Sequence, residues 1–296
     1  MANIEYFDNK MKTERVAVQA RAATGAETGL NRQSKGTPFL QRNEIIRISK
    51  GEILMLNFVL IHGSWHTGAH WTPVVGDLHQ AGHRAFAPTV LGHGEGVGKR
   101  VNHVQQVDDL VNQLIQRNLH DIVLVGHSYA GTLTARLAEE IPDRIRRLVF
   151  WNAFVPRPGN CLLDEVPPHY RTLFDELAAA SSDGTVMLPY PIWREAFIND
   201  ADEALAKSSY DNLSPEPYQP HCDKLDLERF YATQIPKSYL NGTEDNALPQ
   251  GAEWGWHPRM SSRLGLFRLV QMPGSHEVIF TNPGGLAAKL IEAGRD

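Results

Sequence analysis

The residue with the clearest chemical signature is Ser128, which stands between segments that predict a strand and a helix. The run Ile122–Val125 is typical of a buried strand, Gly126 interrupts it, and Thr132–Glu140 is compatible with a helix. This order places Ser128 at the apex of a sharp turn, where its hydroxyl projects from the sheet edge and helix N–H groups point back at it. The sequence therefore predicts a nucleophilic serine. A serine in an ordinary strand-to-helix connection is the alternative.

The turn departs at one position from the usual Gly-x-Ser-x-Gly pattern. Ala130 stands where glycine is usual, and a glycine follows one place later at Gly131. Small side chains are needed there because the helix packs closely against the strand. One additional methyl group is a tolerable change, so we interpret the segment as a variant of the same turn.

A serine hydroxyl is a poor nucleophile near neutral pH, so it needs a base, and the base needs an acid that orients it. In this topology the acid and then the histidine follow the serine, each on a loop after a strand. His276 lies between the last predicted strand and the last helix, which favours it as the base over a surface role. Asp245 is the candidate acid, and the adjacent Glu244 is its rival. The shorter aspartate is easier to hold against an imidazole N–H.

The developing oxyanion of such a reaction needs two backbone N–H donors. One candidate is the N–H of Tyr129, directly after the serine, and the other is the N–H of Ser64, in the loop after the first predicted strand. His62 begins that loop, and we expect it to brace the loop rather than to act as a base.

Strands and helices alternate along the chain from Met55 onward, as a mostly parallel sheet with right-handed crossovers requires. Apolar runs predict strands at 57–62, 84–87, 121–125, 145–151, 235–241 and 266–271. Helical segments are predicted at 69–80, 102–118, 129–140 and 285–293. We therefore expect an α/β protein in which helices flank the sheet.

Residues 155–233 interrupt this alternation and are rich in proline and aromatic residues. A long insertion between core strands lies over the carboxyl ends of the strands, where ligands bind. We therefore expect a helical cap between core segments 55–154 and 234–296. Its aromatic residues indicate an apolar, aromatic substrate, with packing of the cap's own core as the alternative. Three residues are expected to line the substrate, with a structural role open for the second: Trp65, His93 and Trp193.

Residues 1–54 are polar and lack apolar periodicity, so we expect them to be disordered. Their acidic residues disfavour a transit peptide. The codons of Lys50-Gly51-Glu52 can resemble a bacterial ribosome-binding site a few nucleotides before Met55. The hypothesis is that translation starts at Met55 and that residues 1–54 are not native.

Bulk properties disfavour several classes of protein. A net charge of −5 and a pI of about 6.2 give no signature for binding nucleic acid. No apolar run approaches the ~20 residues that span a bilayer, and the start of the chain lacks a signal-peptide pattern. Cys161 and Cys222 lack metal-ligand spacing, so we expect two thiols in a reducing cytoplasm, with one bridge left open. We expect no metal or organic cofactor. Both a monomer and a homodimer stay open.

Segments 58–71, 88–94, 126–128 and 152–156 together resemble the α/β-hydrolase superfamily. Over residues 55–295 the chain is similar to the group that contains methyl-salicylate-type esterases, hydroxynitrile lyases and their bacterial relatives. The resemblance implies an α/β-hydrolase fold, a triad and two oxyanion donors, which fall on Ser128, Asp245, His276, Ser64 and Tyr129. The family's Cys-Thr-Glu-Asp acid loop corresponds to Gly242-Thr-Glu-Asp245, which favours Asp245 over Glu244.

Departures from the family's patterns disfavour some of the reactions that the resemblance would allow. Hydroxynitrile lyases of this type carry a lysine directly after the histidine, whereas this chain has Glu277. Cofactor-free dioxygenases that cleave quinolone rings keep the serine and histidine, and their acid can follow an earlier strand, but segment 151–153 has no carboxylate here. A non-catalytic binding protein is a further alternative, which the complete triad disfavours. The sequence thus predicts a serine hydrolase that cleaves a small ester or lactone through an acyl-enzyme on Ser128.

Overall fold

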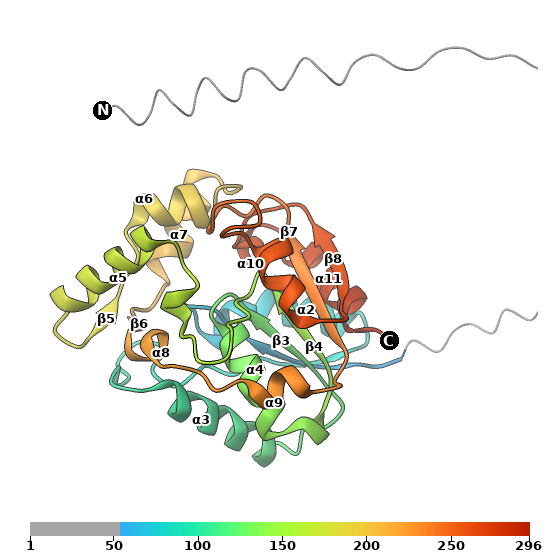
Figure 1. Ribbon diagram of the computed structural model, residues 1–296. Coiled ribbons are helices and arrows are strands. Elements are labelled where there is room, and N and C mark those ends of the chain that lie inside the picture. The colour runs from blue at the N-terminus through green and yellow to red at the C-terminus, as the bar shows by residue number, and fades with distance from the viewer. Residues whose placement is uncertain (1–53) are drawn as a thin grey trace, which may run out of the picture. The chain divides into compact units, whose positions relative to one another are not determined.

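The computed structural model describes residues 54–296, so the expectations for residues 1–53 lie outside the described part of the chain. Six parallel strands form one sheet in the order β2-β1-β3-β4-β7-β8 (Figure 1). They are β1 (Asn57–Ile61), β2 (Arg84–Phe86), β3 (Ile122–His127), β4 (Ile145–Trp151), β7 (Lys237–Gly242) and β8 (Arg268–Met272). The predicted α/β-hydrolase fold with a mostly parallel sheet is confirmed, and the strand ends differ from the predicted ends by two residues at most.

Helices cover both faces of this sheet. Side chains of β3 alternate between the faces, with Leu124 in one apolar cluster and Val125 in the other. The first cluster includes side chains of α3 (His103–Gln116) and α4 (Ala130–Glu140), and the second includes α2 (Thr72–Gln80) and α11 (Pro283–Gly294). Burial on both faces explains why the central strands are continuous apolar runs.

The insertion at 155–233 contains five α-helices, a 3-10 segment (Leu162–Asp164), a π-helical segment (Trp193–Phe197) and a small antiparallel sheet. The α-helices and strands are α5 (Pro168–Ala180), α6 (Tyr190–Ile192), α7 (Glu203–Asp211), α8 (Gln219–Cys222), α9 (Glu228–Ala232), β5 (Thr185–Val186) and β6 (Glu216–Pro217). The expected helical cap thus also contains one short antiparallel strand pair, β5 and β6. In Figure 1, α5, α6, α7, β5 and β6 gather at one end of the sheet, whereas α9 lies beside α4.

Two short helical segments and the two cysteines also bear on the predictions made from the sequence. A 3-10 segment at Gly68–Trp71 precedes α2, and α10 (Val278–Thr281) precedes α11. Both cysteines, Cys161 and Cys222, are free thiols. Within residues 54–296 the structure contains no helix of the length and apolarity that crossing a membrane requires.

The glycine after Ala130 explains the irregular turn motif. Ala130 is fully buried and its methyl group belongs to the apolar cluster beside α4. A β-carbon at Gly131, in contrast, would lie 2.1 Å from the carbonyl oxygen of Phe154. Backbone atoms at that distance overlap, so the close approach of α4 to the segment after β4 requires glycine at 131 and accepts alanine at 130.

Replacing Gly131 with alanine is therefore expected to destabilise the fold. The added methyl group forces the backbone apart, which by analogy with overpacked cores lowers the free energy of unfolding by roughly 1–3 kcal/mol. Gly76→Ala in α2 is the matched control, because a β-carbon there meets nothing within 4 Å. That control is expected to leave the protein as stable or slightly more stable. Urea denaturation of both variants measures the difference, and equal midpoints would refute this account of the turn.

Candidate active site

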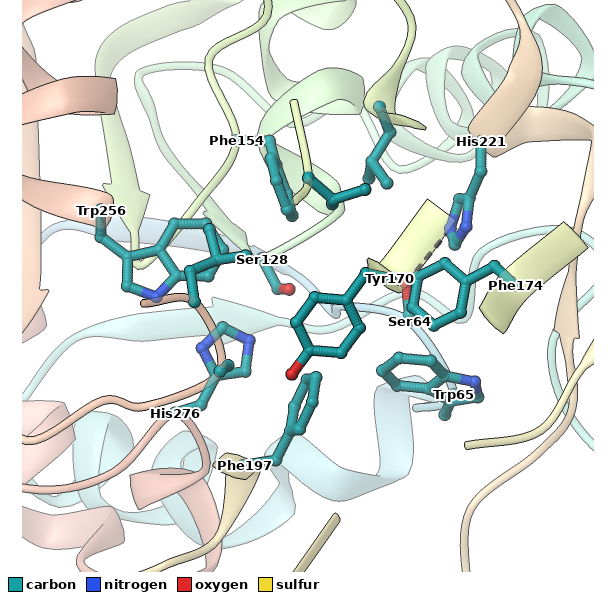
Figure 2. A pocket seen from close by; sticks show the side chains of 14 residues that line it. Ser64, Trp65, Ser128, Phe154, Tyr170, Phe174, Phe197, His221, Trp256 and His276 are labelled. Atoms are coloured by element: carbon teal, nitrogen blue, oxygen red, sulfur yellow. Dashed lines mark hydrogen bonds between the residues drawn. The ribbon is translucent and has the colours of Figure 1, made fainter. Parts of the chain in front are cut away.

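Ser128 occupies a strained backbone position at the end of β3. Its φ of +55° lies in the left-handed region that non-glycine residues rarely adopt. The position is held by three backbone hydrogen bonds: Ser128 N–H donates to the Trp151 carbonyl at 3.2 Å, and the Ser128 carbonyl accepts from Gly131 N–H at 3.1 Å and Phe154 N–H at 3.0 Å. These contacts tie the turn to the end of β4 and aim the hydroxyl into a cavity (Figure 2).

His276 and Asp245 come together on the loops after β8 and β7. His276 Nδ1 donates to Asp245 Oδ2 at 2.6 Å, and both side chains are buried. Asp245 Oδ2 also accepts from Asn152 Nδ2 at 2.6 Å, and Oδ1 accepts from Ala247 N–H at 2.8 Å. Asp245 thus holds His276 through Nδ1, and His276 Nε2 makes no hydrogen bond within residues 54–296. The rival Glu244 is exposed and makes no such contact.

The surroundings of His276 adjust its affinity for protons. Burial lowers the pKa of His276, but the charge of Asp245 and its hydrogen bond outweigh burial, so that the pKa rises above the ordinary value. The ring is fixed by two aromatic neighbours: Trp256 stacks on it with centroids 5.2 Å apart and Phe197 meets it edge-on at 5.3 Å. His127 Nε2 donates to the His276 carbonyl at 3.1 Å and fixes the backbone as well.

Ser128 and His276 line one cavity of about 390 Å³ between the core and the cap. Figure 2 shows both side chains directed into it, with aromatic rings around them. The lining residues are Ser64, Trp65, Ser128, Phe154, Leu162, Val166, Tyr170, Phe174, Phe197, His221, Ala247, Leu248, Trp256 and His276. The wall is therefore predominantly apolar, and its polar groups are few.

The two predicted oxyanion donors lie beside Ser128. Within residues 54–296, neither Ser64 N–H nor Tyr129 N–H donates a hydrogen bond to another protein group. Trp65 N–H, by contrast, donates to a Glu216 carboxylate oxygen at 2.9 Å. The N–H groups of Ser64 and Tyr129 are thus unpaired in this part of the chain, which an oxyanion donor requires.

Of the three residues expected to line the substrate, the structure places only Trp65 on the cavity wall. His93 is buried behind it, where its Nε2 donates to Glu216 at 2.6 Å. Trp193 stacks on Phe197 and lies outside the lining as well. Trp193 thus supports the wall residue Phe197, and His93 binds Glu216 behind the wall. The expectation that His93 and Trp193 line the cavity is therefore corrected.

His62 takes the bracing position expected from the sequence. Its Nε2 accepts from Val90 N–H at 3.0 Å, and its Nδ1 lies 2.9 Å from the Gly63 carbonyl, to which it donates. Burial holds the pKa of His62 well below its ordinary value, so the ring is neutral and links two loops.

Four contributing residues were not found from the sequence: Asn152, Glu216, His221 and Trp256. From the sequence, Asn152 is only a position without a carboxylate. Trp256 belongs to a π-helical turn, Trp256–Met260, which shows no helical period in the sequence. Its one visible signal is a tryptophan eleven residues after the acid Asp245.

Comparison with known proteins agrees with this geometry. The model of the alpha/beta hydrolase family matches residues 58–289. The carbendazim hydrolyzing esterase of Nocardioides sp. (strain SG-4G) is 36% identical over 81% of this chain and 100% of its own. Salicylic acid-binding protein 2 of Nicotiana tabacum is 23% identical over 80% of this chain and 96% of its own.

A solved structure is similar over the same part of the chain. It is an extracellular alpha/beta-hydrolase from a Paenibacillus species, described as sharing structural and functional homology to tobacco Salicylic Acid Binding Protein 2. It is 41% identical, covers 81% of this chain and 100% of its own, and superposes with a TM-score of 0.79. The chain therefore belongs to the alpha/beta hydrolase family, in the group of the salicylic acid-binding protein, the methylesterases and related bacterial esterases.

Proposed function

We propose that the protein is a serine hydrolase that cleaves a carboxylic ester, a class that includes lactones. The observation that carries the proposal is the position of Ser128 and His276 on one cavity, with His276 Nδ1 held by Asp245. The esterase named among the relatives supports ester hydrolysis.

The arrangement supports acyl transfer in two steps. Ser128 Oγ forms a bond to the ester carbonyl carbon while His276 Nε2 takes its proton, and the N–H groups of Ser64 and Tyr129 stabilise the oxyanion. The bond to the alcohol oxygen then breaks, and the alcohol leaves with the proton from His276. Water, activated by His276, attacks the acyl-enzyme, releases the acid and restores Ser128. Asp245 holds the imidazole in the required tautomer throughout.

The cavity favours a small ester with an apolar, aromatic group. The cap contributes the rings of Tyr170, Phe174 and Phe197, and the core contributes Phe154 and Trp256. Edge and face contacts of such rings suit a planar aromatic substituent.

The position after β4 argues against the dioxygenase alternative. Asn152 at that position supplies an amide that donates to Asp245, so His276 is oriented by the acid after β7. No specific feature of this site, within the described residues, therefore favours the dioxygenase reaction.

Two assays on the purified protein test the proposal. A fluorophosphonate probe is expected to label the wild-type protein on Ser128, and aryl esters such as p-nitrophenyl benzoate and small lactones are expected to be hydrolysed without added metal. An unlabelled wild-type protein, or oxygen uptake with a hydroxyquinolone in place of hydrolysis, would contradict the proposal.

A further inference from the structure

The cap strand β6 contributes a buried carboxylate to the core. Glu216 is 0% exposed and sits behind the loop that follows β1. Its Oε2 accepts from Trp65 N–H at 2.9 Å and from His93 Nε2 at 2.6 Å. Its Oε1 lies 3.2 Å from His221 Nε2. One side chain of the cap thus contacts three groups, two of which belong to the walls of the cavity.

The hydrogen bond from Trp65 N–H fixes a peptide plane in the oxyanion loop. At the other end of that plane, the Ser64 carbonyl accepts from His66 Nδ1 at 2.6 Å. Trp65 itself has a φ of +66°, in the left-handed region that a bulky residue adopts only when its surroundings hold it there. Glu216 and His66 are therefore the two side chains that set the orientation of the plane adjoining the Ser64 N–H.

A second contact holds Ser64 through its side chain. Ser64 Oγ hydrogen-bonds His221 Nε2 at 3.2 Å, and that same nitrogen faces Glu216 Oε1 (Figure 2 shows the contact between Ser64 and His221). Ser64 is thus held from both its backbone and its hydroxyl, and both connections lead to Glu216.

The negative charge of Glu216 is compensated by His93 and His221 and takes no part in the proposed reaction. Burial raises the pKa of Glu216, but the charges and hydrogen bonds of His93 and His221 outweigh burial and hold the pKa well below the usual range. The carboxylate is therefore ionised at neutral pH. An uncompensated negative charge near a developing oxyanion would destabilise that oxyanion. The length of the Glu216 side chain, which brings its oxygen to the Trp65 N–H, is therefore what benefits the site, and not its charge.

We infer that Glu216 is a positioning residue of the oxyanion hole, which sets the Ser64 N–H from the cap. The inference rests on the proposed function. The position of the cap thereby affects the oxyanion hole. If the cap is displaced, the Glu216 carboxylate moves away from the Trp65 N–H, and the Ser64 N–H is no longer held in its orientation.

Variants that separate reach from charge test the inference. Glu216→Asp keeps the charge but withdraws the carboxylate by one methylene, whereas Glu216→Gln keeps an acceptor oxygen at the same reach and loses the charge. With p-nitrophenyl benzoate we expect Glu216→Asp and Glu216→Ala to lower kcat about 10- to 100-fold with little change in KM, because displaced oxyanion donors act on the transition state. Glu216→Gln is expected to stay within about fivefold of the wild-type kcat.

The control is another buried carboxylate that accepts a backbone N–H. Glu139, in α4, accepts from Phe230 N–H at 2.7 Å and lies outside the cavity. Glu139→Ala is expected to keep kcat even where it lowers the melting temperature. Glu216→Asp and Glu216→Gln preserve polarity in the buried site and provide folded proteins if the alanine variant does not fold.

A pair of inhibitors distinguishes positioning from general damage. With an aryl trifluoromethyl ketone, Ser128 Oγ bonds to the carbonyl carbon, His276 takes the serine proton, and the C=O double bond opens to leave an oxyanion in the hole. The matching carbinol only fills the cavity. Glu216→Asp is expected to weaken the ketone by the same factor as kcat/KM and to leave the carbinol unchanged. Equal weakening of both, or an unchanged kcat in the aspartate variant, overturns the inference alone. A wild-type protein that neither hydrolyses the ester nor binds the ketone overturns the proposed function and the inference with it.

Discussion

Ser128→Ala is expected to abolish ester hydrolysis, with kcat reduced by about ten thousand- to a million-fold. Ser128 lines the same cavity as His276, the N–H groups of Ser64 and Tyr129 are unpaired among the described residues, and the proposed mechanism makes the Ser128 hydroxyl the nucleophile. Without it no acyl-enzyme forms, and the residual rate reflects binding and the oxyanion donors alone. Initial rates with p-nitrophenyl benzoate measure the loss.

The fold should not change in this variant, because the contacts that hold the turn are made by the backbone of residue 128. Its melting temperature is expected to match that of the wild type, because alanine keeps the β-carbon and therefore the same strain at the left-handed position. Ser208→Ala in α7, at an exposed serine, is the control and is expected to keep full activity. A Ser128→Ala protein that retained more than about a tenth of the rate would contradict a role as nucleophile.

Asp245→Asn is expected to have the second largest effect, a loss in kcat of about ten thousand-fold. Both oxygens of Asp245 accept hydrogen bonds, from His276 Nδ1 and from Ala247 N–H, so the NH2 group of an asparagine must face one of these donors. The variant also lacks the negative charge, so the required tautomer of His276 and its protonated form are no longer stabilised. Glu244→Gln is the matched control one residue away. Because Glu244 is exposed, its activity is expected to stay near that of the wild type. Similar losses in both variants would refute the assignment of the acid.

The pH dependence of kcat/KM tests the interaction of His276 with Asp245 independently. His276 acts as a base only when neutral, and its pKa is raised above the ordinary 6.5 because Asp245 outweighs burial. We therefore expect kcat/KM of the wild type to fall as the pH drops through that raised pKa. In Asp245→Asn burial acts without the opposing charge, so the acid limb of the residual activity moves to lower pH. A limb that stays in place would show that another group controls it.

The core of the fold was predictable because its signals are local. The central strands β1 and β3 are largely apolar runs, and the strand at 145–151 has the predicted ends. The turn motif and the order of Ser128, Asp245 and His276 follow from the same topology, since all three lie after strands whose carboxyl ends meet at one edge of the sheet. The structure brings His276 and Asp245 into contact as that order implies.

The rest of the site depends on contacts between distant segments, which periodicity does not reveal. Asn152 reaches Asp245 across 93 positions, and the Trp65 N–H meets Glu216 across 151. His93 and Trp193 have residue types that suit a substrate pocket, but their neighbours in space decide whether a ring faces the cavity or supports its wall. The cap adopts two short strands in a region whose proline content obscured any strand pattern.

Trapping the acyl-enzyme tests the central claim most directly. The protein is mixed with an excess of p-nitrophenyl benzoate, quenched with acid within the first turnover, digested and examined by mass spectrometry. The account predicts that the peptide containing Ser128 gains the mass of one benzoyl group, that the modification disappears once the substrate is consumed, and that Ser128→Ala shows none. Turnover with an unmodified Ser128 peptide, under conditions in which deacylation is slower than the quench, would contradict it.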